Sequence, residues 1–93
     1  MDGAALIAAE RQRQMDTEGW TPEHDDEHAD GALAQAASLY ARPGVVMLSD
    51  APPYGWPWEP EWWKPSGDRV RDLTKAGALI AAEIDRLQRS RRG

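Results

Sequence analysis

The residues best suited to chemistry gather in a short segment rich in tryptophan and proline. Four of the five tryptophans lie within eight residues, and prolines occupy positions 52, 53, 57, 60 and 65. Proline fixes φ and removes an amide donor, so the segment can form neither a helix nor a central strand. Because indole rings gain free energy by leaving water, we expect it to fold back on the chain as an aromatic wall. Such a wall suits a flat ligand, and its candidate residues are Trp56, Trp58, Trp62 and Trp63.

Basic side chains follow these tryptophans closely along the chain. They are Lys64, Arg69, Arg71 and Lys75, and they surround the start of a predicted helix whose free amides also attract anions. Together with the aromatic wall they predict a nucleotide-like ligand, with the base stacked on indole and the phosphates held by the basic residues. The competing interpretation is that these residues form salt bridges on the surface.

A second pattern is H-x-x-E-H, formed by His24, Glu27 and His28. In the inverted zinc-protease motif, two histidines one turn apart bind zinc and the glutamate acts as general base. The motif lacks a third ligand, and the chain is short for such an enzyme. The simpler interpretation is two solvated histidines in an acidic first turn, and we assign no metal to them.

Asp25, between these histidines, falls on the inward face of the predicted helix. A carboxylate there needs a basic partner. We expect Arg69, Arg71 or Lys75 to supply it, and we assign no metal to Asp25.

Length and composition limit the class of protein. With 93 residues the chain forms one domain, 1–93, with a modest core. It has no cysteine, so no disulfide or thiolate metal site is expected and a cytoplasmic setting is the default. No apolar run approaches the ~20 residues of a membrane span. The net charge of -5 argues against binding to duplex nucleic acid.

Three helices are predicted to position these residues, which places the chain in the all-α class. The first covers about 4–18 and ends at Gly19, and its polar side chains Glu10, Arg11, Arg13 and Gln14 are expected to face water or a partner. The second covers about 22–41 as one continuous helix, and the third about 66–89. Between the last two lies an irregular Trp/Pro loop, 43–65, in which the β-like run 45–48 is too short to build a sheet.

The third helix carries an apolar seam. Its members are spaced 3-4-3-4-3, the a/d spacing of helices that pack together; they are Val70, Leu73, Gly77, Ile80, Ile84 and Leu87. We expect this seam, widened to a stripe by Ala76, Leu79 and Ala81, to pack on the second helix and, if it is wide enough, on another chain. Residues 16–30 hold seven acids and no Lys or Arg, whereas 64–93 hold eight bases against four acids. Both features predict a homo-oligomer.

Several blocks of the sequence resemble a family of small, mostly uncharacterised proteins encoded by phages and prophages. The blocks are 10–14 (ERQRQ), 19–28 (GWTPEHDDEH), 56–58 (WPW), 62–65 (WWKP), 71–73 (RDL), 75–80 (KAGALI) and 82–84 (AEI). The resemblance implies an accessory role in the cytoplasm of an infected bacterium. By analogy of context, some phage proteins of this size are oligomeric sponges that sequester the signalling nucleotides of bacterial immunity.

We therefore expect a protein that binds a nucleotide-type ligand without transforming it, and that needs no cofactor. One alternative is a MazG-like pyrophosphohydrolase, in which paired carboxylates on adjacent helices hold Mg²⁺. Glu23, Asp26 and Glu27 would have to face Asp72 for this, and the third helix lacks the expected acidic pair. Another alternative is an adaptor that grips a host protein through its Trp-rich loop. The sequence thus leaves enzymatic activity open and favours binding.

Overall fold

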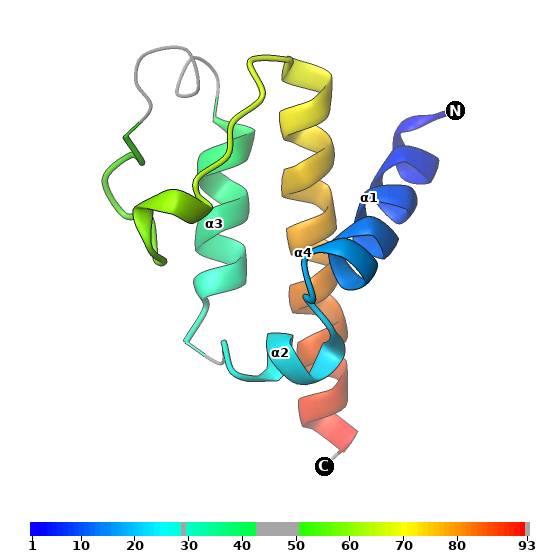
Figure 1. Ribbon diagram of the computed structural model, residues 1–93. Helices are drawn as coiled ribbons and strands as arrows, with labels where there is room; N and C mark the ends of the chain where they lie inside the picture. Colours follow the sequence, from blue (N-terminus) through cyan, green and yellow to red (C-terminus); the bar gives the residue numbers. More distant parts are fainter. Residues whose placement is uncertain (29, 43–50, 93) are drawn as a thin grey trace.

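The computed structural model describes residues 1–28, 30–42 and 51–92, and in these ranges the protein is all-α. Its helices are α1 (Gly3–Thr17), α2 (Pro22–Asp26), α3 (Ala32–Ala41) and α4 (Arg69–Arg92), with a short 3₁₀ helix, η2 (Pro60–Trp62). The helices α3 and α4 run antiparallel, and both α1 and α2 pack on α4 (Figure 1). No helix in the described ranges has the length and apolarity needed to cross a membrane.

The first helix begins and ends where its sequence predicts. The Asp2 carboxylate accepts a hydrogen bond from the Ala5 amide at 2.9 Å and so caps the N-terminus. At the other end Gly19 adopts a φ of 74°, which a side chain would strain. This turn lets the Trp20 amide donate to the Gln14 carbonyl at 3.0 Å. It also aims the following residues back across α4.

The predicted helix 22–41 is wrong as a single element, because the structure divides it into α2 and α3. Thr21 caps the first piece by accepting from the His24 amide at 3.3 Å, as its sequence indicates. Gly31 then takes a φ of 86°, and the Asp30 carboxylate accepts from the Ala32 amide at 3.1 Å, which starts a new helix. The local turn preferences of Asp and Gly outweigh the apolar periodicity that runs through them. Position 29 lies outside the described residues, as does the run 45–48.

Small residues bring α3 and α4 close together. Ala36 and Ala37 on α3 and Ala76 and Ala82 on α4 are all buried, so the two backbones can approach. Leu33, Leu39 and Leu79 fill the remaining space and are almost fully buried. This alanine-rich contact is the centre of the hydrophobic core, and Tyr40 and Trp63 extend it toward the Trp/Pro loop.

The inward face of α1 is polar, contrary to the sequence prediction. Glu10, Arg11 and Gln14 are buried against the rest of the chain, while Ala5 and Ala8 are exposed. A buried charge is tolerated only where it is paired and hydrogen-bonded. Glu10 pairs with Arg71 and Arg11 pairs with Asp25, and the Gln14 amide donates to Glu10 at 3.2 Å. Polar contacts therefore help to attach α1.

The seam of α4 is also placed differently from its prediction. Val70 is 60% exposed, Ile80 47% and Ile84 51%, and Leu73 and Leu87 are similarly open. The core side of α4 is instead its alanines and Leu79. Of the six seam positions only Gly77 is covered, because Ile7 of α1 packs directly over it. The prediction that the six seam residues pack on the second helix is wrong, but Ala76 and Leu79, which were expected to widen the seam, do lie in the core with α3.

Candidate functional site

The Trp/Pro loop is anchored by two of its tryptophans. Trp63 is 5% exposed and stacks on Tyr40, with ring centroids 4.6 Å apart. Trp56 packs edge-on against both rings, and its ring centroid lies 5.8 Å from that of Tyr40 and 5.0 Å from that of Trp63. The Lys64 amide donates to the Tyr40 hydroxyl at 2.9 Å. Trp56 and Trp63, predicted as ligand platforms, thus belong to the core and fix the loop.

The other two tryptophans of the loop, Trp58 and Trp62, line an open pocket of about 630 Å³. The opposite wall comes from the end of α1, from α2 and from the start of α3. The complete lining is Glu18, Trp20, His24, His28, Leu33, Pro57, Trp58, Glu59 and Trp62. Two of the four predicted tryptophans therefore reach the site, as the sequence indicates.

Three aromatic residues of the pocket were not assigned to it from the sequence. Trp20 and His24 lie parallel, with an interplanar angle of 3° and centroids 6.3 Å apart. Trp58 contacts both Trp20 and His28, with ring centroids 5.9 Å and 5.2 Å apart. The positions 20, 24 and 28 are spaced by four residues, although only His24 lies within α2, and Trp20 and His28 flank this helix. That regular spacing is the signal that could have grouped them.

Among the predicted phosphate ligands, Arg69 is engaged elsewhere. Its guanidinium donates to the carbonyl oxygens of Tyr40, Ala41 and Arg42, at 3.4 Å for Tyr40 and 3.1 Å for Arg42. These are the carbonyls left free at the C-terminus of α3, so Arg69 caps that helix.

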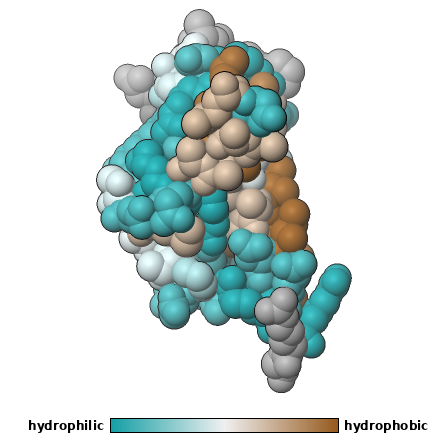
Figure 2. Space-filling model, turned by 90° about the vertical axis from the view of Figure 1, so that its right-hand side faces the viewer, coloured by the Kyte–Doolittle hydropathy of each residue, from teal (hydrophilic) through white to brown (hydrophobic). Residues whose placement is uncertain are grey.

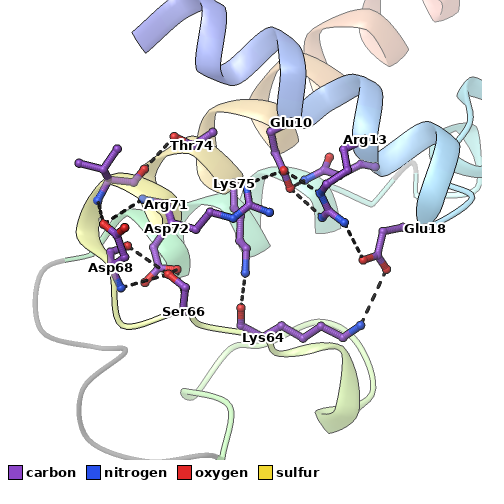
Figure 3. A network of polar contacts seen from close by, with 12 residues as sticks. Glu10, Arg13, Glu18, Lys64, Ser66, Asp68, Arg71, Asp72, Thr74 and Lys75 are labelled. Carbon is purple, nitrogen blue, oxygen red and sulfur yellow. Dashed lines mark hydrogen bonds and ion pairs between the residues drawn. The ribbon is translucent and has the colours of Figure 1, made fainter. Parts of the chain in front are cut away.

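Arg71 and Lys75 belong to a polar network between α1, α4 and the loop (Figure 3). Arg71 forms an ion pair with Glu10 at 2.6 Å. Lys75 donates to the Lys64 carbonyl and lies over the Tyr40 ring. Burial, and then repulsion from Arg71, lower the pKa of Lys75. Neither residue lines the pocket, so the predicted basic site beside the tryptophans is not assembled there.

Lys64 is the exception among the predicted cations. Its side chain is 56% exposed, its ammonium lies 3.8 Å from a Glu18 carboxylate oxygen, and it sits over the Trp62 ring at 5.3 Å. Both contacts are with residues that line the pocket. Lys64 therefore stands at the edge of the site and can offer one positive charge to a ligand.

Glu10 joins the network to α1. Burial alone would raise the pKa of its carboxyl, but hydrogen bonds from Arg13 and Arg71 and their charges bring it from the ordinary 4.5 to about 2. Arg13 also pairs with Glu18 at 3.3 Å, and Glu18 with Lys64. A chain of alternating charges thus leads from the interior to the pocket wall.

Asp25 is fully buried and pairs with Arg11 at 2.7 Å. The predicted partners Arg69, Arg71 and Lys75 are wrong, because these residues lie in the first turns of α4, whereas α2 lies beside Arg89 in its last turns. Arg11 also donates to the Trp20 carbonyl at 3.2 Å. The second Asp25 oxygen lies 3.7 Å from the His24 Nδ1. The buried pair therefore stands directly behind the Trp20 and His24 wall of the pocket.

The two histidines contact each other, with ring centroids 5.0 Å apart. Over the described ranges, no group of three or more His, Cys, Asp or Glu side chains is arranged to hold a metal ion. The chemical resources of the pocket are π-faces, two imidazoles and the carboxylates of Glu18 and Glu59. Such a lining binds a planar ring and accepts hydrogen bonds from its edge.

Compared with known proteins, the chain matches no family model, no curated protein and no solved structure.

Proposed function

We propose that this protein binds a nucleotide-type ligand by its base and holds it intact. The observation that carries the proposal is the open pocket of about 630 Å³, walled by Trp20, Trp58 and Trp62. A nucleobase stacked on an aromatic side chain gains about 1–3 kcal/mol. Three indoles around one space offer more than one such face.

The polar groups of the pocket indicate which part of a nucleotide it recognises. Glu18 and Glu59 are hydrogen-bond acceptors when ionised, which suits a base edge that carries amino or imino N–H donors. The Trp58 indole N–H is buried and finds no acceptor among the described residues, so it can donate to a ring nitrogen or carbonyl. These features favour a purine over a ligand held mainly by its phosphates.

The engaged basic residues support the same conclusion. Arg69, Arg71 and Lys75 are engaged away from the pocket, whereas Lys64 stands at the pocket edge, where it pairs with Glu18 and keeps a side chain that is 56% exposed. Binding then depends on stacking and base-edge contacts, and salt should weaken it little. A role in sequestering signalling nucleotides during infection fits this mode of binding together with the phage resemblance.

Hydrolysis by paired carboxylates is less well supported by the geometry. Asp26 pairs with Arg89, whereas Asp72 accepts hydrogen bonds from Ser66 at the opposite end of α4. From position 72 to 89 the helix rises about 25 Å, at about 1.5 Å per residue. The carboxylates of the proposed metal site therefore do not converge.

The test is to incubate the purified protein with a mixture of purine and pyrimidine nucleotides, cyclic oligonucleotides and ADP-ribose derivatives, with and without Mg²⁺. We expect a purine compound to be retained unchanged. Conversion that requires Mg²⁺ would favour the hydrolase instead. If the folded protein retains no nucleotide, the adaptor hypothesis replaces this one, and the exposed Trp62 becomes its first candidate anchor.

A pair of variants in the same loop locates the site. Trp62→Ala removes a pocket face that is 39% exposed, so the fold should survive and the affinity should fall roughly tenfold. Tyr54→Ala is the matched control, because Tyr54 is fully exposed and does not line the pocket. Equal affinities for both variants would remove the pocket from consideration.

A further inference from the structure

Most of the outer face of α4 is left uncovered by the described residues; the exception is Gly77, over which Ile7 of α1 packs. Five large aliphatic side chains stand on it, between 42% and 60% exposed; they are Val70, Leu73, Ile80, Ile84 and Leu87. A helix face open to water normally carries charged and polar residues. None of the six seam positions is charged.

Four arginines of α4 are engaged within the chain. Arg71 pairs with Glu10, Arg86 with Glu83 and Arg89 with Asp26. Arg69 is bound to the carbonyls of α3. These four side chains are therefore not free to cover the apolar face, although Asp85 and Arg91 of the same helix are exposed.

The first helix enlarges the apolar surface. Ile7 covers Gly77 and so joins the two helices, while Ala4, Ala5, Ala8 and Ala9 are exposed on α1. The space-filling view shows a strongly hydrophobic strip beside weakly hydrophobic atoms (Figure 2). A groove of about 400 Å³ also opens between α1 and α4, and its lining is mixed, with Leu6, Ala9 and Val70 beside Glu10, Arg13, Asp68, Arg71 and Thr74.

The spacing of the seam identifies what can cover it. The intervals 3-4-3-4-3 read the same in both directions, so an antiparallel copy of α4 places each seam residue opposite another. Val70 then meets Leu87 of the copy and Leu73 meets Ile84, while Ile80 meets the Ile7 side chain that covers Gly77, with the two-fold axis between positions 78 and 79. An isologous contact of this kind needs a self-complementary patch, and this patch is self-complementary.

The area is adequate for such a contact. Five half-exposed aliphatic side chains leave on the order of 400 Å² per chain, which is the size of patch that marks an interaction site. With Leu6, Ile7 and the alanines of α1, two copies bury on the order of 1,000 Å², the lower bound for a specific interface.

We propose that two copies of this chain associate through the outer faces of α4, antiparallel about a two-fold axis near positions 78 and 79. The proposal does not depend on the identity of the ligand. Neither the pocket nor the loop takes part in the contact, so both sites of the dimer remain open.

The molecular mass of the protein in solution tests whether two copies associate. We expect a dimer at micromolar concentration by light scattering, and Ile80→Asp should convert it to a monomer with unchanged helical circular dichroism. The matched control is Ala34→Asp, because Ala34 is exposed on α3 and away from the seam. A parent protein that stays monomeric at about 100 μM would overturn the proposal, and so would an Ile80→Asp variant that remains dimeric.

Single cysteines test the orientation, because the natural chain has none. In the antiparallel register the two copies of position 80 lie about 4.5 Å apart along the axis, whereas the two copies of position 87 lie about 25 Å apart. Ile80→Cys should therefore form a disulfide-linked dimer and Leu87→Cys should not. Mixing Val70→Cys with Leu87→Cys should give the mixed dimer. Efficient self-linkage of Leu87→Cys would indicate parallel helices and contradict the proposed register.

Discussion

The helices α1 and α4 distribute their side chains in opposite ways. The inward side of α1 is charged, with Glu10 and Arg11 buried, whereas the outward side of α4 is aliphatic, with Ile80 and Ile84 half exposed. In α1 each buried charge has a partner within the chain, so its burial is compatible with a folded monomer. In α4 the exposed groups have none. The difference shows that a buried helix face can be charged where the chain supplies partner charges. The aliphatic outer face of α4 would gain its partner from the proposed second copy of the chain.

The largest effect should come from the buried ion pair at the end of α1. Asp25→Asn leaves the Arg11 guanidinium buried beside a neutral group, which should lower the free energy of unfolding by about 3–5 kcal/mol in urea denaturation. Asp26→Asn is the matched control, since Asp26 is next in sequence and pairs with Arg89 at the surface. The control should cost less than about 1 kcal/mol. Similar losses for the two variants would mean that Arg11 is solvated.

A smaller effect is expected at Glu10, whose bonds to Arg13 and Arg71 are charge-assisted. Glu10→Gln should lower the free energy of unfolding by about 1.5–3 kcal/mol near neutral pH. Because the folded-state pKa lies below its ordinary value, this stabilisation is complete above pH of about 4.5 and is lost as pH falls toward about 2. The variant should lack that part of the acid dependence. Denaturation followed from pH 6 to pH 2 measures it, and parallel curves would contradict the assignment.

The smallest effect is expected on the outer face of α4. Ile84→Gln changes a side chain that is 51% exposed, so unfolding of the dilute monomer should shift by less than about 0.5 kcal/mol. Leu79→Ala, on the inner face of the same helix, should cost about 2–5 kcal/mol. Thermal or urea unfolding at low protein concentration gives both values. A large loss at Ile84 would show that the face is covered within a single chain.

Features encoded in a few neighbouring residues could be predicted from the sequence. The end of α1 at Gly19, the cap at Thr21 and the irregular Trp/Pro loop are of this kind. The break between α2 and α3 was also local, in Asp30 and Gly31, but the surrounding apolar periodicity masked it.

Features that depend on which helices meet could not be predicted in the same way. Arg11 and Asp25 are 14 residues apart, and nothing in their local sequence selects each other over Arg71 or Lys75. The alanine face of α4 and its aliphatic seam are both apolar, so periodicity alone could not show which side turns inward. In the pocket, Trp58 and Trp62 could be proposed from the tryptophan-rich sequence of the loop. The residue that α2 contributes to the same pocket could be assigned only after the fold was known.

The wall of the pocket has a consequence for how long a ligand stays bound. The helix α2 has five residues and is too short to persist alone. Arg11 holds it from α1 through Asp25, and Arg89 holds it from the last turns of α4 through Asp26 and the Pro22 carbonyl. The Arg89 pair lies at the surface, whereas the Arg11 pair is buried. Replacement of Arg89 should therefore loosen α2 and quicken the dissociation of a ligand, even though this arginine does not line the pocket.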